Sequence, residues 1–209
     1  MTSLVTYEKL KSGSWLKACL FAPCCGLEGR TLYLDLDTVL VGDLRPLLRY
    51  SGPFATLSAA GFSAEEGVAG GYNSSLMLWE AGAEGGAEGG AEGGARPDTA
   101  AAALRALHSS LGEPVFRCLM RWDHWLEMVV PTAHLVQDAF PGLVVDYRQA
   151  CAGRARPPAG AAVVCFPRSP KPHEAPEQWV ARHWTEGDED AETALEERTC
   201  QRSFSLGDA

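Results

Sequence analysis

Two acidic residues, Asp35 and Asp37, follow directly on the apolar run at residues 31–34 and are separated by a single leucine. The run favours a buried strand, as in the centre of an α/β sheet, and side chains alternate along a strand, so we expect both carboxylates on one side. Open α/β sheets keep their ligands just beyond the carboxyl ends of strands. Carboxylate oxygens suit Mg²⁺ and Mn²⁺, and acids beside a core need a compensating charge. The pair therefore predicts a divalent metal site.

The composition fits an ordinary globular protein and argues against several function classes. The chain has 209 residues, of which 46% are hydrophobic and 22% charged. Residues 185–209 carry eight acidic and two basic side chains, which accounts for −6 of the net charge of −9 and leaves no basic field for nucleic acid. We expect no membrane span and no signal peptide, because no apolar run is long enough. Seven cysteines without zinc-finger spacing predict reduced thiols in a cytoplasmic protein.

Helical and strand patterns are mixed along the chain, which predicts an α/β fold. Besides residues 31–34, strands are expected at 54–57, 76–79, 143–147 and 161–166. Helices are expected at 6–21, 44–49 with Asp43 as its cap, 99–109, part of 115–130, and 175–184.

Two segments have compositions that do not support a packed core. The Ala-Glu-Gly-Gly repeat at about residues 81–97 predicts a flexible insertion. The acidic residues 185–209 predict a disordered tail. We therefore expect one folded domain over residues 1–184, interrupted by the insertion.

Three motifs in a fixed order make the chain resemble the GT-A glycosyltransferases, and among them proteins of glycosyltransferase family 8. Residues 33–44, which begin Tyr-Leu-Asp-Leu-Asp, resemble the Tyr-Leu-Asp-x-Asp segment of the family. Residues 72–78, Tyr-Asn-Ser-Ser-Leu-Met-Leu, are similar to the strand that lines its sugar pocket. Residues 163–173 resemble its closing metal and diphosphate loop. The ordered set is more specific than the acid pair alone.

The resemblance extends over about residues 14–184. Lys-Pro-His-Glu at 171–174, followed by Trp-Val at 179–180, is similar to a bacterial group of these proteins. The resemblance implies a GT-A-like mixed sheet flanked by helices. Relatives have a nucleotide-binding strand and helix well before the acid pair, whereas 34 residues precede Asp35. We therefore expect part of the N-terminal nucleotide-binding segment to be missing.

The resemblance also implies roles for four charged residues. Asp35 and Asp37 would hold Mn²⁺, or Mg²⁺, on the diphosphate of a nucleotide sugar, most simply a UDP-sugar, whose sugar passes to an unknown acceptor. Lys171 matches the lysine of the loop that closes over the diphosphate. Lys17 occupies a place where the family often has a basic residue near the donor. The alternative for each is structural: acids that cap a turn, and lysines exposed to solvent.

Three further residues complete the implied site. Asn73 would contact the donor sugar, with a turn residue as its alternative, and Asp123 stands where relatives have an Asp-Gln pair, here followed by His124. The family's third metal ligand is a histidine, but Cys165 occupies the aligned position. Cysteine suits a hard cation poorly, so His173 is the predicted third ligand, with a structural role as its alternative.

Two other functions fit parts of the same pattern. Residues 34–41 also match the first motif of haloacid-dehalogenase-like phosphatases, in which Asp35 would attack phosphate, Asp37 would serve as acid and base, and Lys171 would be the required lysine. The second possibility is a catalytically inactive glycosyltransferase-like domain that binds sugar or a partner. The short N-terminal segment and the altered third ligand motivate it.

Overall fold

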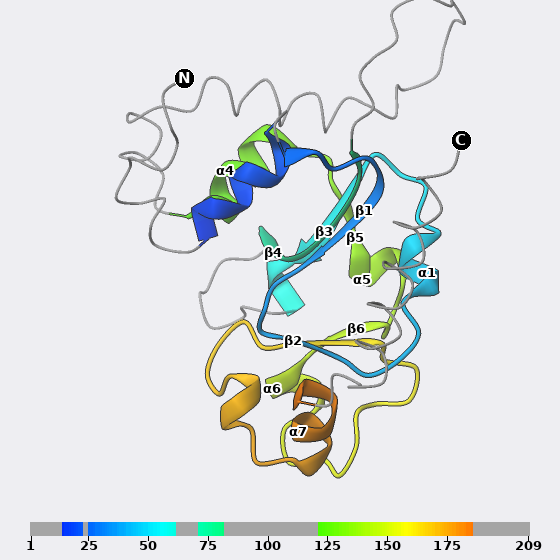
Figure 1. Cartoon of the computed structure of the whole chain (residues 1–209), viewed down its shortest axis with the longest axis vertical. Helices are drawn as coiled ribbons and strands as arrows, with labels where there is room; N and C mark the ends of the chain where they lie inside the picture. The colour runs from blue at the N-terminus through cyan, green and yellow to red at the C-terminus, as the bar shows by residue number, and fades with distance from the viewer. Residues whose placement is uncertain (1–13, 23–24, 62–70, 82–120, 186–209) are drawn as a thin grey trace, which may run out of the picture. The chain divides into compact units, whose positions relative to one another are not determined.

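The structure is a computed structural model, and it describes residues 14–22, 25–61, 71–81 and 121–185 (Figure 1). The predicted helix at 99–109 lies outside these ranges. So do the Ala-Glu-Gly-Gly insertion after Ala81 and the acidic tail after Thr185. Among the described residues, no helix has the length and apolar character needed to cross a membrane.

The chain divides into two compact units, each with helices and strands of its own. Unit 1 comprises residues 1–36 and 43–144, and unit 2 comprises residues 37–42 and 145–209, in each case as far as they are described. Each unit contains a β-sheet, so the predicted α/β class is confirmed.

Unit 1 is built on a four-stranded mixed sheet in the order β1-β4-β3-β5 (Figure 1). Its strands are β1 (Gly29–Leu34), β3 (Phe54–Ser58), β4 (Tyr72–Ala81) and β5 (His134–Leu135). β4 is antiparallel to both of its neighbours, whereas β3 and β5 are parallel. The three strands predicted in this unit are confirmed, and β5 was not predicted.

The prediction that residues 31–34 form a buried central strand is wrong. β1 lies at one edge of the described sheet and is half-buried throughout. The central place belongs to β4, whose residues from Asn73 to Trp79 are all buried, as expected for a strand covered on both faces. A four-residue apolar run is too short to distinguish an edge strand from a central one.

Unit 1 also contains helical segments among its described residues. They are η2 (Ser14–Phe21), α1 (Arg45–Leu48), η4 (Ala59–Gly61), α4 (Trp122–Val129) and α5 (Val136–Ala139). The described part of the helix predicted at 6–21 is η2, which is a 3₁₀-helix. The N-cap of α1 is Leu44, so the prediction that Asp43 is the cap is wrong by one residue. The Asp43 carboxylate nevertheless accepts the N–H of Arg45, the first residue of α1, at 2.9 Å.

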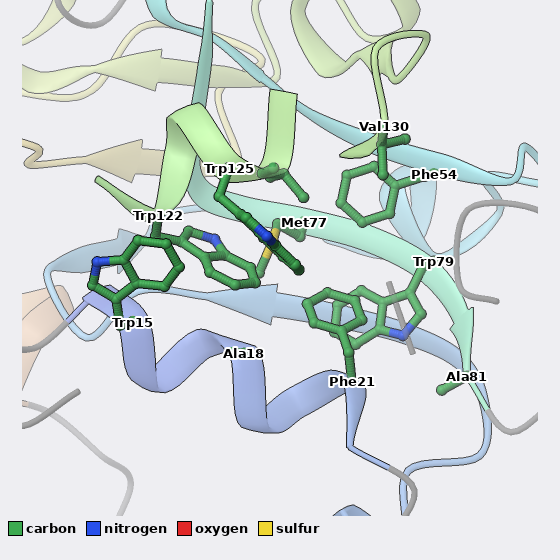
Figure 2. Close-up of a cluster of buried hydrophobic side chains, with 11 residues drawn as sticks. Trp15, Ala18, Phe21, Phe54, Met77, Trp79, Ala81, Trp122, Trp125 and Val130 are labelled. Carbon is green, nitrogen blue, oxygen red and sulfur yellow. The ribbon is translucent and has the colours of Figure 1, made fainter. Parts of the chain in front are cut away.

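An aromatic core joins η2 and α4 to the sheet (Figure 2). Trp122 of α4 lies 6.0 Å, between ring centroids, from both Trp15 and Phe21 of η2. Phe21 also lies 4.9 Å from Trp79 of β4. These large buried rings contribute much of the hydrophobic stabilisation of the unit. They also fix η2, which carries Lys17, and α4, which carries the predicted Asp123.

Unit 2 contains a three-stranded sheet in the order β2-β7-β6 (Figure 1). Its elements are β2 (Thr38–Leu40), β6 (Val144–Asp146), α6 (Tyr147–Ala150), β7 (Val163–Cys165), η6 (Pro172–Glu174) and α7 (Gln178–Thr185). The strands predicted at 143–147 and 161–166 and the helix at 175–184 are confirmed. β2 and α6 were not predicted.

A glutamate ties the segments of unit 2 to one another. The Tyr147 hydroxyl donates to Oε2 of Glu177, and the N–H of Gly153 donates to its Oε1 at 2.6 Å. Burial raises the pKa of Glu177, but the Tyr147 and Gly153 hydrogen bonds outweigh it and hold that pKa below its usual 4.5. The charged form is therefore the stabilising one.

Glu177→Gln is expected to remove a pH-dependent part of the stability of unit 2. Because the pKa of Glu177 is lower in the folded state, its contribution is present above about pH 4.5 and is lost as the pH falls through the folded pKa. The melting temperature of the wild type should exceed that of the variant near pH 7, and the gap should close on acidification. Thermal unfolding across this range measures it, with Glu28→Gln, an exposed site, as control. A gap that is independent of pH would contradict this role for the charge.

Candidate functional site

The Asp35 carboxylate accepts hydrogen bonds from two side chains of unit 1. β1 ends at Leu34, and the N–H of Asp35 continues its pairing by donating to the Ser75 carbonyl at 2.9 Å. The Lys17 ammonium lies 2.7 Å from Oδ1 and 2.9 Å from Oδ2 of Asp35. The Tyr33 hydroxyl donates to Oδ1 at 2.7 Å. Asp35 is therefore an oriented, charge-compensated anion at the end of a strand.

Lys17 is largely buried and makes contacts with two strands. It projects from η2, and its side chain is 10% exposed, against 22% for Asp35. Its ammonium also donates to the carbonyl and hydroxyl of Ser74 at 3.1 and 3.0 Å. The same group lies 5.4 Å from the centroid of the Tyr33 ring. The structural alternative of an exposed helix lysine is therefore wrong, and Lys17 lies beside the first acid of the motif.

Asn73 and Asp123 hold the backbone at the start of β4. Oδ1 of Asp123 accepts the N–H of Ser74 at 3.0 Å. Oδ1 of Asn73 accepts the N–H of Ser75 at 2.9 Å, and Asn73 is buried within β4 rather than in a turn before it. Ser74 also binds Lys17, so the structure brings Asn73 and Asp123 to the neighbourhood of Asp35. In the described contacts both side chains act on the backbone.

Asp37 is paired with the predicted loop lysine inside unit 2. The Lys171 ammonium donates to Oδ2 of Asp37 at 2.5 Å and to the Phe166 carbonyl at 2.9 Å. The N–H of Phe166 donates to the Asp37 carbonyl at 3.0 Å, which anchors the backbone of the acid as well. The side chains of Lys171 and Asp37 are 35% and 29% exposed, so solvent or a ligand can reach the pair.

The prediction placed the Asp35 and Asp37 carboxylates on one side because side chains alternate along a strand. This reasoning does not apply, because neither acid lies within β1. β1 ends at Leu34, and Asp37 lies in the turn that precedes β2. Each carboxylate is paired with a lysine of its own unit, Asp35 with Lys17 and Asp37 with Lys171.

Neither His173, the predicted third ligand, nor Cys165, at the aligned position, completes a metal group in the described part of the chain. His173 lies in η6 with its side chain 68% exposed, and its ring lies 4.0 Å from Glu174. Cys165 is fully buried in β7, in register with Thr38 of β2. Within the described ranges, no three or more His, Cys, Asp or Glu residues are grouped so that they could hold a metal ion.

By its chemistry, each of the two acids taken alone suits one kind of metal site. Mg²⁺ and similar ions at phosphate-transfer sites take one or two protein carboxylates and fill their other positions with substrate phosphate and water. Asp35 and Asp37 supply two hard oxygen donors, and each already balances a positive charge in this structure. Each carboxylate therefore suits an ion whose other positions are filled by substrate phosphate and water.

Two residues near Asp35 were not predicted to contribute. Tyr33 lies two positions before Asp35, and residues spaced by two share a face of a strand, so the sequence held a signal for its contact. Ser74 binds Lys17 through both its hydroxyl and its carbonyl. A backbone carbonyl has no sequence signature, so that contact required the tertiary structure.

Lys17→Met should destabilise unit 1 because it leaves the Asp35 carboxylate without its ammonium partner. The pair is mostly but not fully buried, so we expect a loss of about 1–3 kcal/mol, less than for a fully buried pair. Urea denaturation measures it. Asp35→Asn in the Lys17→Met background removes the uncompensated charge and should recover part of the loss. A double variant no more stable than Lys17→Met would contradict charge compensation as the cause.

Comparisons with known proteins assign the chain to no family. No protein-family model, no curated protein and no solved structure matches it. The chemistry of the two acid–lysine pairs is therefore the basis on which a function can be proposed.

Proposed function

We propose that the protein is a metal-dependent glycosyltransferase with a GT-A-like fold. It would move a hexose-type sugar from a nucleotide-diphosphate donor, most simply a UDP-sugar, to an acceptor, and it would act in the cytoplasm. The observation that carries the proposal is the pairing of both motif acids with lysines. Lys17 pairs with Asp35 and Lys171 pairs with Asp37, and both lysines were predicted at the donor site from sequence.

The acid–lysine pairs combine the two kinds of group that a nucleotide-diphosphate sugar requires. Asp35 and Asp37 would bind the divalent cation, and the ammonium groups would bind phosphate oxygens directly. When bound, Mn²⁺ or Mg²⁺ supplies positive charge where the leaving diphosphate becomes more negative. Haloacid-dehalogenase-like chemistry also uses an acid and a lysine, but it would be identified by a covalent adduct on Asp35.

Lys171 is the better placed of the two lysines for contact with the donor. Its pair with Asp37 is about one-third exposed, whereas Lys17 is enclosed by Asp35 and Ser74. A cation on Asp37 would repel the Lys171 ammonium, which could then bind a phosphate oxygen of the donor instead. Lys171 would thereby stabilise the leaving group, while Lys17 holds the first acid.

The direct test is a titration of the whole chain with Mn²⁺, followed by a panel of UDP-sugars with Mn²⁺ present. Calorimetric binding of both, and release of UDP from at least one donor, would support the proposal. Absence of both Mn²⁺ and donor binding would overturn it. Binding without any release of UDP would indicate the catalytically inactive alternative. A beryllofluoride adduct on Asp35 would indicate the phosphatase, because such an adduct requires an attacking carboxylate.

A further inference from the structure

Tyr33 contacts both members of the Lys17–Asp35 pair with different parts of its side chain. Its hydroxyl donates to Oδ1 of Asp35 at 2.7 Å. The face of its ring lies 5.4 Å from the Lys17 ammonium, within the range of a cation–π contact. The ring also packs against the aromatic core of unit 1. The hydroxyl can therefore be removed while the ring keeps its other contacts.

From this geometry we propose that Tyr33 is a positioning residue, which fixes the orientation of the Asp35 carboxylate for cation binding. The inference rests on the proposed function, because it gives Asp35 the role of metal ligand. Lys17 touches both oxygens of Asp35, at 2.7 and 2.9 Å, and so does little to distinguish them. The hydrogen bond from Tyr33 selects Oδ1 and so breaks the near-symmetry of the carboxylate.

The neutral hydroxyl suits this role better than a second charge would. A divalent cation on Asp35 would repel the Lys17 ammonium and weaken its hold on the carboxylate. The Tyr33 hydroxyl carries no net charge, so a divalent cation on Asp35 does not repel it. Its hydrogen bond to Oδ1 therefore remains when the contact between Asp35 and the Lys17 ammonium is weakened. Groups that hydrogen-bond a metal ligand in this way commonly change metal affinity 10- to 100-fold when they are removed.

Tyr33→Phe tests the inference, because it removes the hydroxyl and keeps the ring. We expect the Kd for Mn²⁺, measured without donor by electron paramagnetic resonance of the free ion, to rise about tenfold. The matched control is Tyr50→Phe, in the same unit. The Tyr50 hydroxyl donates to the Phe54 carbonyl at 2.9 Å and lies 2.9 Å from Nδ1 of His134, so that variant loses contacts that involve neither Asp35 nor Lys17. Its Mn²⁺ affinity should equal that of the wild type.

A double-mutant cycle separates the inference from the proposed function. Tyr33→Phe and Asp35→Asn are combined, and urea denaturation measures the unfolding constants. If the effects of the two substitutions on the unfolding constant differ from independence by a factor of about ten or more, the hydrogen bond to the charged carboxylate is established. If the wild type binds Mn²⁺ and Tyr33→Phe binds it equally well, the positioning role is overturned. If the wild type binds neither Mn²⁺ alone nor a UDP-sugar with Mn²⁺ present, the proposed function fails, and with it the cation-binding role of Tyr33. A coupling in the cycle would then leave Tyr33 as a structural partner of Asp35 alone.

Discussion

Asp37→Asn is expected to abolish sugar transfer while the protein remains folded. The substitution removes the negative charge that Asp37 would offer to the cation, and it removes the partner of the Lys171 ammonium. Loss of a direct ligand to the catalytic ion should lower UDP release about a hundred- to a thousandfold, by analogy with the loss of about 2.7–4 kcal/mol for one transition-state contact. The pair is about one-third exposed, so solvent screens it and the melting temperature should change by only a few degrees.

The control for this prediction is Asp138→Asn, an exposed acid of α5. It carries the same chemical change, and its transfer rate should match that of the wild type. Circular dichroism of both variants verifies the fold. Full activity of Asp37→Asn, or activity of the wild type with all divalent metal chelated, would show that the metal role of this acid is wrong.

Trp122→Ala is expected to destabilise unit 1 by about 3–5 kcal/mol, the range found when a buried aromatic side chain is truncated. The ring of Trp122 is fully buried and lies between Trp15, Phe21 and Trp125, with centroid distances of 6.0, 6.0 and 4.7 Å (Figure 2). Its removal leaves a cavity that these rigid rings cannot fill without moving. Urea denaturation followed by far-UV circular dichroism measures the change in the free energy of unfolding.

Met128→Ala provides the control on the same helix. Met128 is 70% exposed, so its truncation removes little buried surface and should cost less than about 1 kcal/mol. Equal losses for the two variants would contradict a core centred on Trp122. Trp122→Phe should recover much of the stability, because it keeps a ring at this position. It also removes an indole N–H that has no hydrogen-bond partner among the described residues.

Local pattern predicted the elements that have strong apolar periodicity. Segments 54–57 and 161–166 were predicted as strands because runs of apolar, β-favouring residues are bounded by turn residues, and β3 and β7 occupy them. Some of the elements with two to four residues, β5 and α6 among them, were missed. Such short segments are stabilised by their neighbours in space, and their own sequences carry too little signal.

Sequence also selected the residues of the candidate site, because their chemical types do not depend on the fold. Carboxylates at Asp35 and Asp37 attract cations, and lysines at positions 17 and 171 attract anions. None of these patterns showed which lysine meets which acid, because the partners are 18 and 134 positions apart in the chain.

The tertiary structure decided the pairings and the place of β1. Hydrogen bonding of β4 to both β1 and β3 puts β1 at the edge of the described sheet. The sequence predicted Asp35 and Asp37 on the same side because side chains alternate along a strand. β1 ends at Leu34, so this alternation does not extend to the two acids. The sequence by itself therefore determined which charges are available, since side-chain chemistry is local. Which charges meet is set by the packing of distant segments, and only the folded chain brings those together.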